Sequence, residues 1–163
     1  MHDMLRKLPP SAKRVQDALK AAGVACEVVE MPSLTRTAQE AADAIGCTVA
    51  QIAKSLIFRT KQTLRLILII ASGVNRVDEK KVGQIVGEIL EKPDAEYVKQ
   101  KTGFTIGGIP PVGHSELLTT YLDKDLMKHD VIWAAAGTPF AVFKLTPTEL
   151  VRLAPDARQV DIH

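Results

Sequence analysis

A segment rich in glycine and proline, residues 102–114 (TGFTIGGIPPVGH), is the part of the sequence best suited to chemistry. Four glycines and two prolines within it exclude a helix interior and predict a long loop. The adjacent Gly107 and Gly108 let a ligand approach the backbone closely, and the prolines stiffen the loop in advance. This pattern is typical of a preorganised cradle for a carbonyl, ribose or phosphate oxygen. The alternative is a rigid connector between two strands.

Two side chains could act beside such a loop. Lys54 stands between a short predicted helix near 49–53 and a predicted strand over 55–59, among apolar residues, so we expect partial burial. Lys54 would then serve as a fixed cation or, if desolvated enough, lose its proton. The alternative is a structural lysine whose aliphatic stem covers the edge of the sheet while its ammonium stays in water. His114 closes the loop and could serve acid–base chemistry or bind a substrate hydroxyl, unless it is an ordinary exposed histidine.

Several other reaction classes lack their motifs. No GxxxxGK[ST] and no GxGxxG is present, which argues against ATPase and dehydrogenase chemistry. There is no GxSxG nucleophile elbow, and neither Cys26 nor Cys47 has an activating neighbour. These cysteines form no CxxC pair and the histidines do not cluster, so we predict no metal site and no cofactor. A hydrolase built this way would position the ester, a water and the substrate's own groups.

Length and composition predict one ordinary soluble domain over residues 1–163, with 46% hydrophobic and 25% charged residues. A net charge of +2 and 4% aromatic residues argue against a broad nucleic-acid surface or a base-stacking platform. Contacts with nucleic acid would come from local patches, such as Arg59 with Lys61 or Lys99 with Lys101, unless these are solvated charges. The lack of a signal region, of a membrane-length apolar run and of paired cysteines predicts a cytoplasmic protein.

The order of predicted elements indicates an α/β fold of the α+β type. Helices are expected over 11–22, 37–45, 79–86, 95–101 and 146–153, and strands over 24–30, 55–59, 64–71, 118–122, 131–135, 141–145 and 159–162. Several strands follow one another without a helix of crossover length. We therefore predict a single domain with a mixed, mostly antiparallel central sheet flanked by helices. The strand over 64–71 is apolar on both faces after Arg65 and should be central.

Four stretches of the chain resemble the YbaK-type, prolyl-tRNA synthetase-associated editing domains. They are TAQEAADAIGCTVAQIAKSLIF (37–58), ASGVNRVDEKKV (71–82), TGFTIGGIPPVGH (102–114) and WAAAGTPFAVFKL (133–145). They occur in the family's order and cover nearly the whole chain. The lysine, the glycine–proline loop and the late strand–glycine–strand together make the resemblance specific.

The resemblance implies trans-editing, the hydrolysis of the ester between a wrongly attached amino acid and tRNA, without a metal. The family's catalytic lysine falls on Lys54, which would place or polarise the aminoacyl carbonyl region. The family's loop, which holds the terminal adenosine and the ester, and its late glycine fall on Gly107, Gly108, Ile109, Pro110, Gly113 and Gly137. His114 follows as a further substrate-binding candidate.

The substrate is expected to carry a small or hydroxylated amino acid, such as Ser, Thr, Ala or Cys. Where the cysteinyl-tRNA deacylase branch has Ser-Gly-Gly, this chain has Ala135-Ala136-Gly137, which counts against cysteine. The expected partners are the acceptor end of tRNA and an aminoacyl-tRNA synthetase, and no membrane. Two other functions stay open on the residues: a non-catalytic module that binds tRNA or a synthetase, and a small-molecule esterase or amidase.

Overall fold

The computed structural model describes residues 8–31, 37–116 and 118–163. Within these ranges the α-helices are α1 (Pro10–Ala21), α2 (Ala38–Ile45), α3 (Glu79–Val86), α4 (Ala95–Thr102) and α5 (Pro147–Leu153). The strands are β1 (Val28–Glu30), β2 (Ile52–Thr60), β3 (Leu66–Ser72), β4 (Leu90–Glu91), β5 (Thr119–Asp123), β6 (Ile132–Ala135), β7 (Ala141–Leu145) and β8 (Arg158–Val160). Two 3₁₀ helices are η2 (Val49–Gln51) and η3 (Lys124–Lys128).

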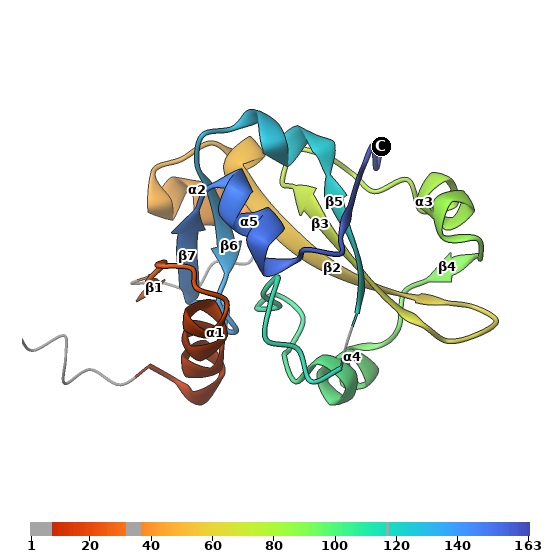
Figure 1. The fold of residues 1–163 in the computed structure, drawn as a ribbon, viewed down its shortest axis with the longest axis horizontal. Helices are drawn as coiled ribbons and strands as arrows, with labels where there is room; N and C mark the ends of the chain where they lie inside the picture. The colour runs from red at the N-terminus through yellow and green to blue at the C-terminus, as the bar shows by residue number, and fades with distance from the viewer. Residues whose placement is uncertain (1–7, 32–36, 117) are drawn as a thin grey trace, which may run out of the picture.

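One sheet joins all the described strands, and the helices surround it (Figure 1). Its order is β1-β7-β6-β2-β3-β5-β8, and β4 pairs with the far end of β2. The pairs β1–β7, β6–β7, β2–β3 and β2–β4 are antiparallel, whereas β2–β6, β3–β5 and β5–β8 are parallel. The predicted mixed, mostly antiparallel sheet flanked by helices is confirmed.

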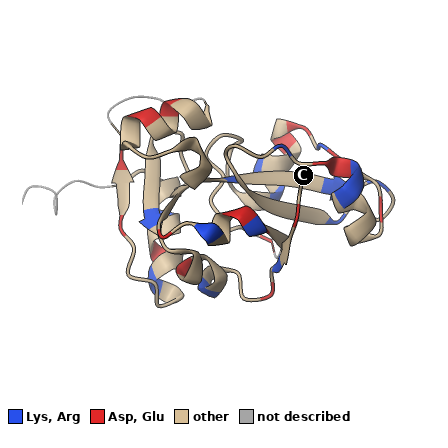
Figure 2. Ribbon diagram, turned by 90° about the horizontal axis from the view of Figure 1, so that it is seen from above, with Lys and Arg blue, Asp and Glu red and all other residues tan. Residues whose placement is uncertain are grey.

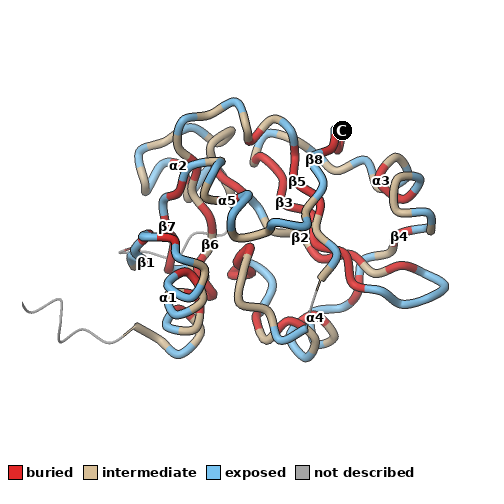
Figure 3. Tube along the Cα trace, in the orientation of Figure 1, coloured by how far each residue is buried: buried red, intermediate tan, exposed pale blue. Residues whose placement is uncertain are grey.

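The core has two parts, one on each side of β3, which is buried along its whole length (Figure 3). Leu68 and Ile70 belong to a cluster that also contains buried residues of α1, α4 and α5. Ile67 and Ile69 belong to a second cluster with Val82 of α3. Because alternate residues of a strand point to opposite faces, β3 is apolar on both sides, as predicted for a central strand.

Capping residues set the helix ends near the site. The Oγ1 atom of Thr37 accepts the Glu40 N–H at the start of α2, and Gly46, with φ of 86°, ends that helix. The side chains of Asp78 and Thr146 cap α3 and α5 in the same way. A side-chain acceptor at the N-cap satisfies a backbone donor that the helix itself leaves unpaired. The helices predicted from these residues are therefore confirmed.

The start of β2 differs from the prediction. The short helix expected near 49–53 is the single turn η2, and the strand begins at Ile52 instead of 55. Lys54 is therefore the third residue of a strand, and its side chain is exposed rather than partly buried. Residues 49–53 form a short, mostly apolar run, and the pattern of such a run does not separate a helical turn from a strand.

No helix in the described part of the chain combines the length and the apolar character that a membrane span requires.

Candidate active site

The candidate site is a pocket of about 300 Å³ at the point where β6 leaves β2. The two strands pair at two positions, Ile52 with Trp133 and Ala53 with Ala134. Beyond this pairing, Lys54 on β2 and Ala135 on β6 both line the pocket, so it lies in the gap between the diverging strands. Its volume is at the lower end of about 300–1,000 Å³, the range usual for small-molecule sites.

The walls of the pocket are mostly small and apolar. They are formed by Thr37, Ala38, Ala41 and Ile45 at α2, by Ile106, Gly107 and Ile109 of the glycine–proline loop, and by Thr138, Pro139, Ala141 and Val142 after β6. Of the described residues that line the pocket, Lys54 alone carries a charge. A cation against low-dielectric walls interacts more strongly with a developing negative charge than it would in water.

The backbone around Lys54 is fixed from β3. Lys54 lies opposite Ala71, and the neighbouring pair is Ala53 with Ser72. The Ser72 hydroxyl donates to the Ala50 carbonyl at 2.8 Å, just before β2 begins. The Gly73 N–H donates to the Ile52 carbonyl, also at 2.8 Å. These bonds hold the first residues of β2, and therefore the origin of the Lys54 side chain, in one position.

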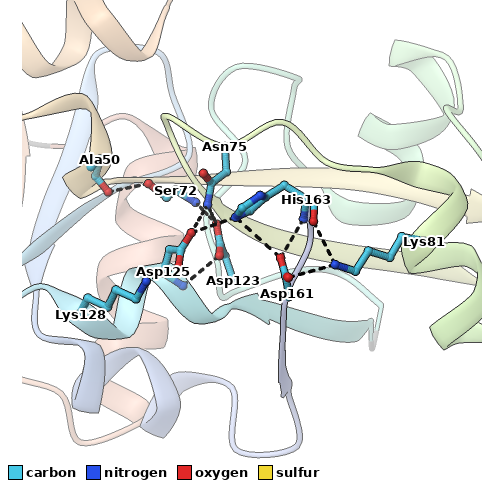
Figure 4. A network of polar contacts seen from close by, with 9 residues as sticks. All are labelled: Ala50, Ser72, Asn75, Lys81, Asp123, Asp125, Lys128, Asp161 and His163. Atoms are coloured by element: carbon cyan, nitrogen blue, oxygen red, sulfur yellow. Dashed lines mark hydrogen bonds and ion pairs between the residues drawn. The ribbon is translucent and has the colours of Figure 1, made fainter.

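A buried carboxylate holds Ser72 in turn (Figure 4). Asp123, at 1% exposure, accepts the Ser72 N–H at 2.9 Å and the Asn75 side-chain amide at 2.8 Å through Oδ2. Its Oδ1 accepts the Asp125 N–H at 2.9 Å. A buried carboxylate requires such donors, since an unpaired charge in the interior is costly. Asp123 therefore joins the ends of β3 and β5.

Residues after β8 extend this network. The Asp125 carboxylate contacts Lys128 at 2.9 Å and His163 Nε2 at 3.1 Å, and these bonds, with one from Asn75, hold the pKa of Asp125 well below its usual range. Lys81 of α3 forms an ion pair with Asp161 at 3.0 Å (Figure 4). The segment after β8 is thus attached to both η3 and α3.

The predicted glycines of the site divide into two groups. Gly107, with Ile109, lines the pocket. Gly108 and Gly137 serve packing: a Cβ on Gly108 would lie 2.8 Å from the Cα of Thr138, and one on Gly137, where φ is 92°, would lie 2.6 Å from the Ser11 carbonyl. The Gly137 N–H donates to the Gly108 carbonyl at 2.9 Å, and the Gly108 N–H donates to Thr105. These two N–H groups are used within the protein, so the expected cradle does not contain them as free donors.

The structure does not bring His114 and Gly113 to the Lys54 pocket. Both line a second pocket, of about 530 Å³, between the glycine–proline loop and the segment after α5. His114 Nε2 lies 2.7 Å from the carbonyl oxygen of the buried Pro110, and its ring meets Phe104 edge-on at 6.1 Å. Burial lowers the pKa of His114. These contacts make His114 a half-buried residue that stabilises the loop.

One residue from each of the two predicted basic patches lies at the same aromatic ring. The guanidinium of Arg59 and the ammonium of Lys101 lie 4.6 and 5.7 Å from the centre of the Tyr97 ring. Each also has an acidic partner: Arg59 contacts Glu91 at 2.6 Å, and Lys101 contacts Glu116 at 3.5 Å. Basic and acidic residues are interspersed over the ribbon (Figure 2). Only local contacts with a polyanion are therefore available here.

Sequence reasoning missed most of the pocket wall. Ser55 and Trp133 line it, as do residues of α2. Ser55 could have been predicted from its position next to Lys54. The part of the wall that β6 forms could have been predicted from the run of small residues after Trp133. The contribution of α2 depends on tertiary packing and has no local signal.

The comparisons with known proteins identify the family. The model of the aminoacyl-tRNA editing domain matches residues 33–153. The chain belongs to this family of editing domains.

Several known proteins are similar to this chain. A solved structure described as "a putative trans-editing enzyme for prolyl tRNA synthetase" is 47% identical, with a TM-score of 0.90 over 96% of this chain and 98% of the other. YwhH of Bacillus subtilis, uncharacterised, is 32% identical over 83% of this chain and 86% of its own length. The "Putative Cys-tRNA(Pro)/Cys-tRNA(Cys) deacylase EbsC" of Enterococcus faecalis is 26% identical over 72% and 71%. The proline–tRNA ligase of Kosmotoga olearia is 35% identical over 61% of this chain, which corresponds to 17% of the ligase.

Proposed function

We propose that this protein is a trans-editing hydrolase that deacylates mischarged aminoacyl-tRNA, with the aminoacyl ester bound in the Lys54 pocket. One observation carries the proposal: a single cation, among the described lining residues, in a small apolar pocket. The matching family and the names of the relatives support the same class of reaction. Gly107 and Ile109 would contact the substrate, whereas Gly108, Pro110 and Gly137 would hold the loop that carries them.

The reaction needs one attack and one bond cleavage. A water oxygen, with its proton taken up by the terminal ribose hydroxyl or a second water, attacks the ester carbonyl carbon. The bond between that carbon and the ribose oxygen then breaks, and the ribose oxygen takes a proton. Lys54 would stabilise the negative charge that develops on the carbonyl oxygen. Loss of a comparable donor in other hydrolases lowers kcat by a factor on the order of 10²–10³. The products are the free amino acid and uncharged tRNA.

The walls favour a small amino acid. Ala53, Ala134 and Ala135 border the pocket together with Gly107, and its volume is about 300 Å³. A larger side chain would be rejected by steric overlap, whereas one methylene would be discriminated by only about 1–3 kcal/mol. Alanine, serine, threonine and cysteine are therefore the candidates to compare.

Partners are proposed on the same basis. The pocket would take the acceptor end of tRNA, and the similarity to a segment of proline–tRNA ligases favours a synthetase as the second partner. Basic residues near Tyr97 offer local phosphate contacts.

The test is deacylation of tRNAs charged with alanine, serine, threonine or cysteine, measured as release of labelled amino acid. Hydrolysis of one or two of them, above that of a correctly charged prolyl-tRNA, is the expected result. Hydrolysis of none, together with binding of uncharged tRNA, would favour a non-catalytic binding module. Turnover of simple amino-acid esters but not of charged tRNA would favour a small-molecule esterase.

A further inference from the structure

Ser55, next to Lys54, has a polar side chain without a partner. Its Oγ is buried and makes no hydrogen bond to the described residues, and the residue lines the pocket. The other two hydroxyl residues of the pocket wall are already engaged. Thr37 Oγ1 accepts the Glu40 N–H at 3.1 Å, and Thr138 Oγ1 accepts the Phe140 N–H at 3.2 Å. A buried hydroxyl left unpaired is unfavourable, so Ser55 is suited to a ligand that supplies the missing partner.

The backbone of Ser55 also faces the gap between β2 and β6. In an antiparallel pair, alternate residues direct both N–H and C=O toward the partner strand. Ile52 and Thr60 direct theirs toward the β3 side, as shown by bonds with Gly73 and Arg65. Ser55 lies an odd number of positions from both, so its N–H and C=O point away from β3.

No described strand pairs with this edge at Ser55. β6 pairs with β2 at Ile52 and Ala53, and β4 pairs at Arg59 and Thr60. Between these two pairings the edge borders the pocket, which Lys54, Ser55 and Leu56 line. Ser55 therefore presents two oxygen acceptors, the carbonyl and Oγ, together with donors, at the place where the sheet opens.

We propose that Ser55 is a specificity-determining residue that binds the α-ammonium group of the aminoacyl substrate through its carbonyl oxygen and Oγ. An ammonium group carries three donors and no acceptor, and the described lining residues include no carboxylate to receive them. Lys54 repels a cation, so the ammonium lies toward Ser55 and the ester carbonyl lies toward Lys54. This inference rests on the proposed deacylase function and adds a requirement for a free amino group.

The experiment compares tRNAs charged with alanine, serine, threonine or cysteine with their N-acetyl-aminoacyl forms, in which the ammonium is replaced by a neutral amide. The wild type is expected to hydrolyse the free form with a kcat/KM about ten- to a hundredfold higher, since hydrogen bonds to charged groups are worth about that factor. Ser55→Ala and Ser55→Cys should lose most of this preference by slowing the free form. Ser55→Thr, which keeps the hydroxyl, should retain it.

Thermal stability separates this role from a structural one. Because Oγ has no partner within the described protein, Ser55→Ala should leave the Tm unchanged or raise it. A wild type that hydrolyses both forms equally, or a Ser55→Ala variant with full activity and full preference, would overturn the inference and leave the deacylase function standing. A drop in Tm that accounts for the lost activity would overturn it as well. A wild type that hydrolyses neither form of any of the four charged tRNAs would refute the deacylase function and this inference together.

Discussion

Replacing Asp123 by asparagine tests whether the buried carboxylate supports the site. Asp123 Oδ2 accepts two donors, from Ser72 and Asn75, and Oδ1 accepts a third, from Asp125. An asparagine side chain keeps one oxygen, so at least one buried or half-buried N–H would face an NH₂ group instead of an acceptor. A donor left without its acceptor costs about 1–3 kcal/mol, and we expect the free energy of unfolding to fall by that amount.

The assay is urea unfolding followed by far-ultraviolet circular dichroism, with the slope of the transition checked for equality between variants. Asp17→Asn is the matched control, because Asp17 forms an exposed pair with Lys13 at 2.8 Å and should contribute less than about 1 kcal/mol. Since Asp123 holds Ser72 beside the start of β2, deacylation should also slow in Asp123→Asn. A loss of stability no larger than that of the control would refute the reasoning.

Three further predictions follow from the same structure. In urea unfolding, Gly108→Ala should destabilise the protein by more than Gly107→Ala, because a Cβ on Gly108 would meet the Thr138 backbone. A Cβ on Gly107 would meet nothing within 4 Å, so that variant carries only the strain of a φ of 96°, about 1–2 kcal/mol. The free energy of unfolding should decline as pH falls below 6.5, the ordinary pKa of a histidine. Burial lowers the pKa of His114 in the folded state, so the unfolded chain binds the proton first. His114→Gln should flatten that part of the plot of stability against pH. Cys26, whose pKa burial raises to about 11, should react with a thiol reagent only after unfolding, whereas the partly exposed Cys47 should react earlier.

Each of these predictions has a contrary outcome. Equal losses for the two glycine variants would show that the loop does not pack against the β6–β7 turn as described. A His114→Gln profile identical to that of the wild type would assign the pH dependence to another group. Equal labelling rates for Cys26 and Cys47 in the native protein would mean that the first thiol is not buried.

The sequence predicts best where a local rule decides the structure. β3 could be placed as a central strand because six of its seven residues, Leu66 to Ala71, are apolar and lie on both faces. The ends of α2, α3 and α5 followed from the capping residues Thr37, Asp78 and Thr146. In each case the interaction that fixes the element lies within a few residues of chain.

Elements that depend on distant partners could not be predicted. β4 has two residues and exists because they pair with Arg59 and Thr60 of β2. The same holds for the site: Lys54 and Gly107 line one pocket, whereas His114, seven residues after Gly107, lines the other. Closeness in sequence does not indicate which side of a loop faces which cavity.

The most direct test of the central claim is the deacylation rate of Lys54→Ala beside that of Lys80→Ala. Both residues are exposed, but only Lys54 lines the pocket. Removing an exposed side chain changes the free energy of unfolding by about 0.5 kcal/mol or less, so both variants should be folded. The account predicts that Lys54→Ala loses on the order of a hundredfold or more in kcat/KM on the preferred charged tRNA, while Lys80→Ala stays close to the wild type. Full activity in a folded Lys54→Ala variant would contradict the account and place the reaction elsewhere.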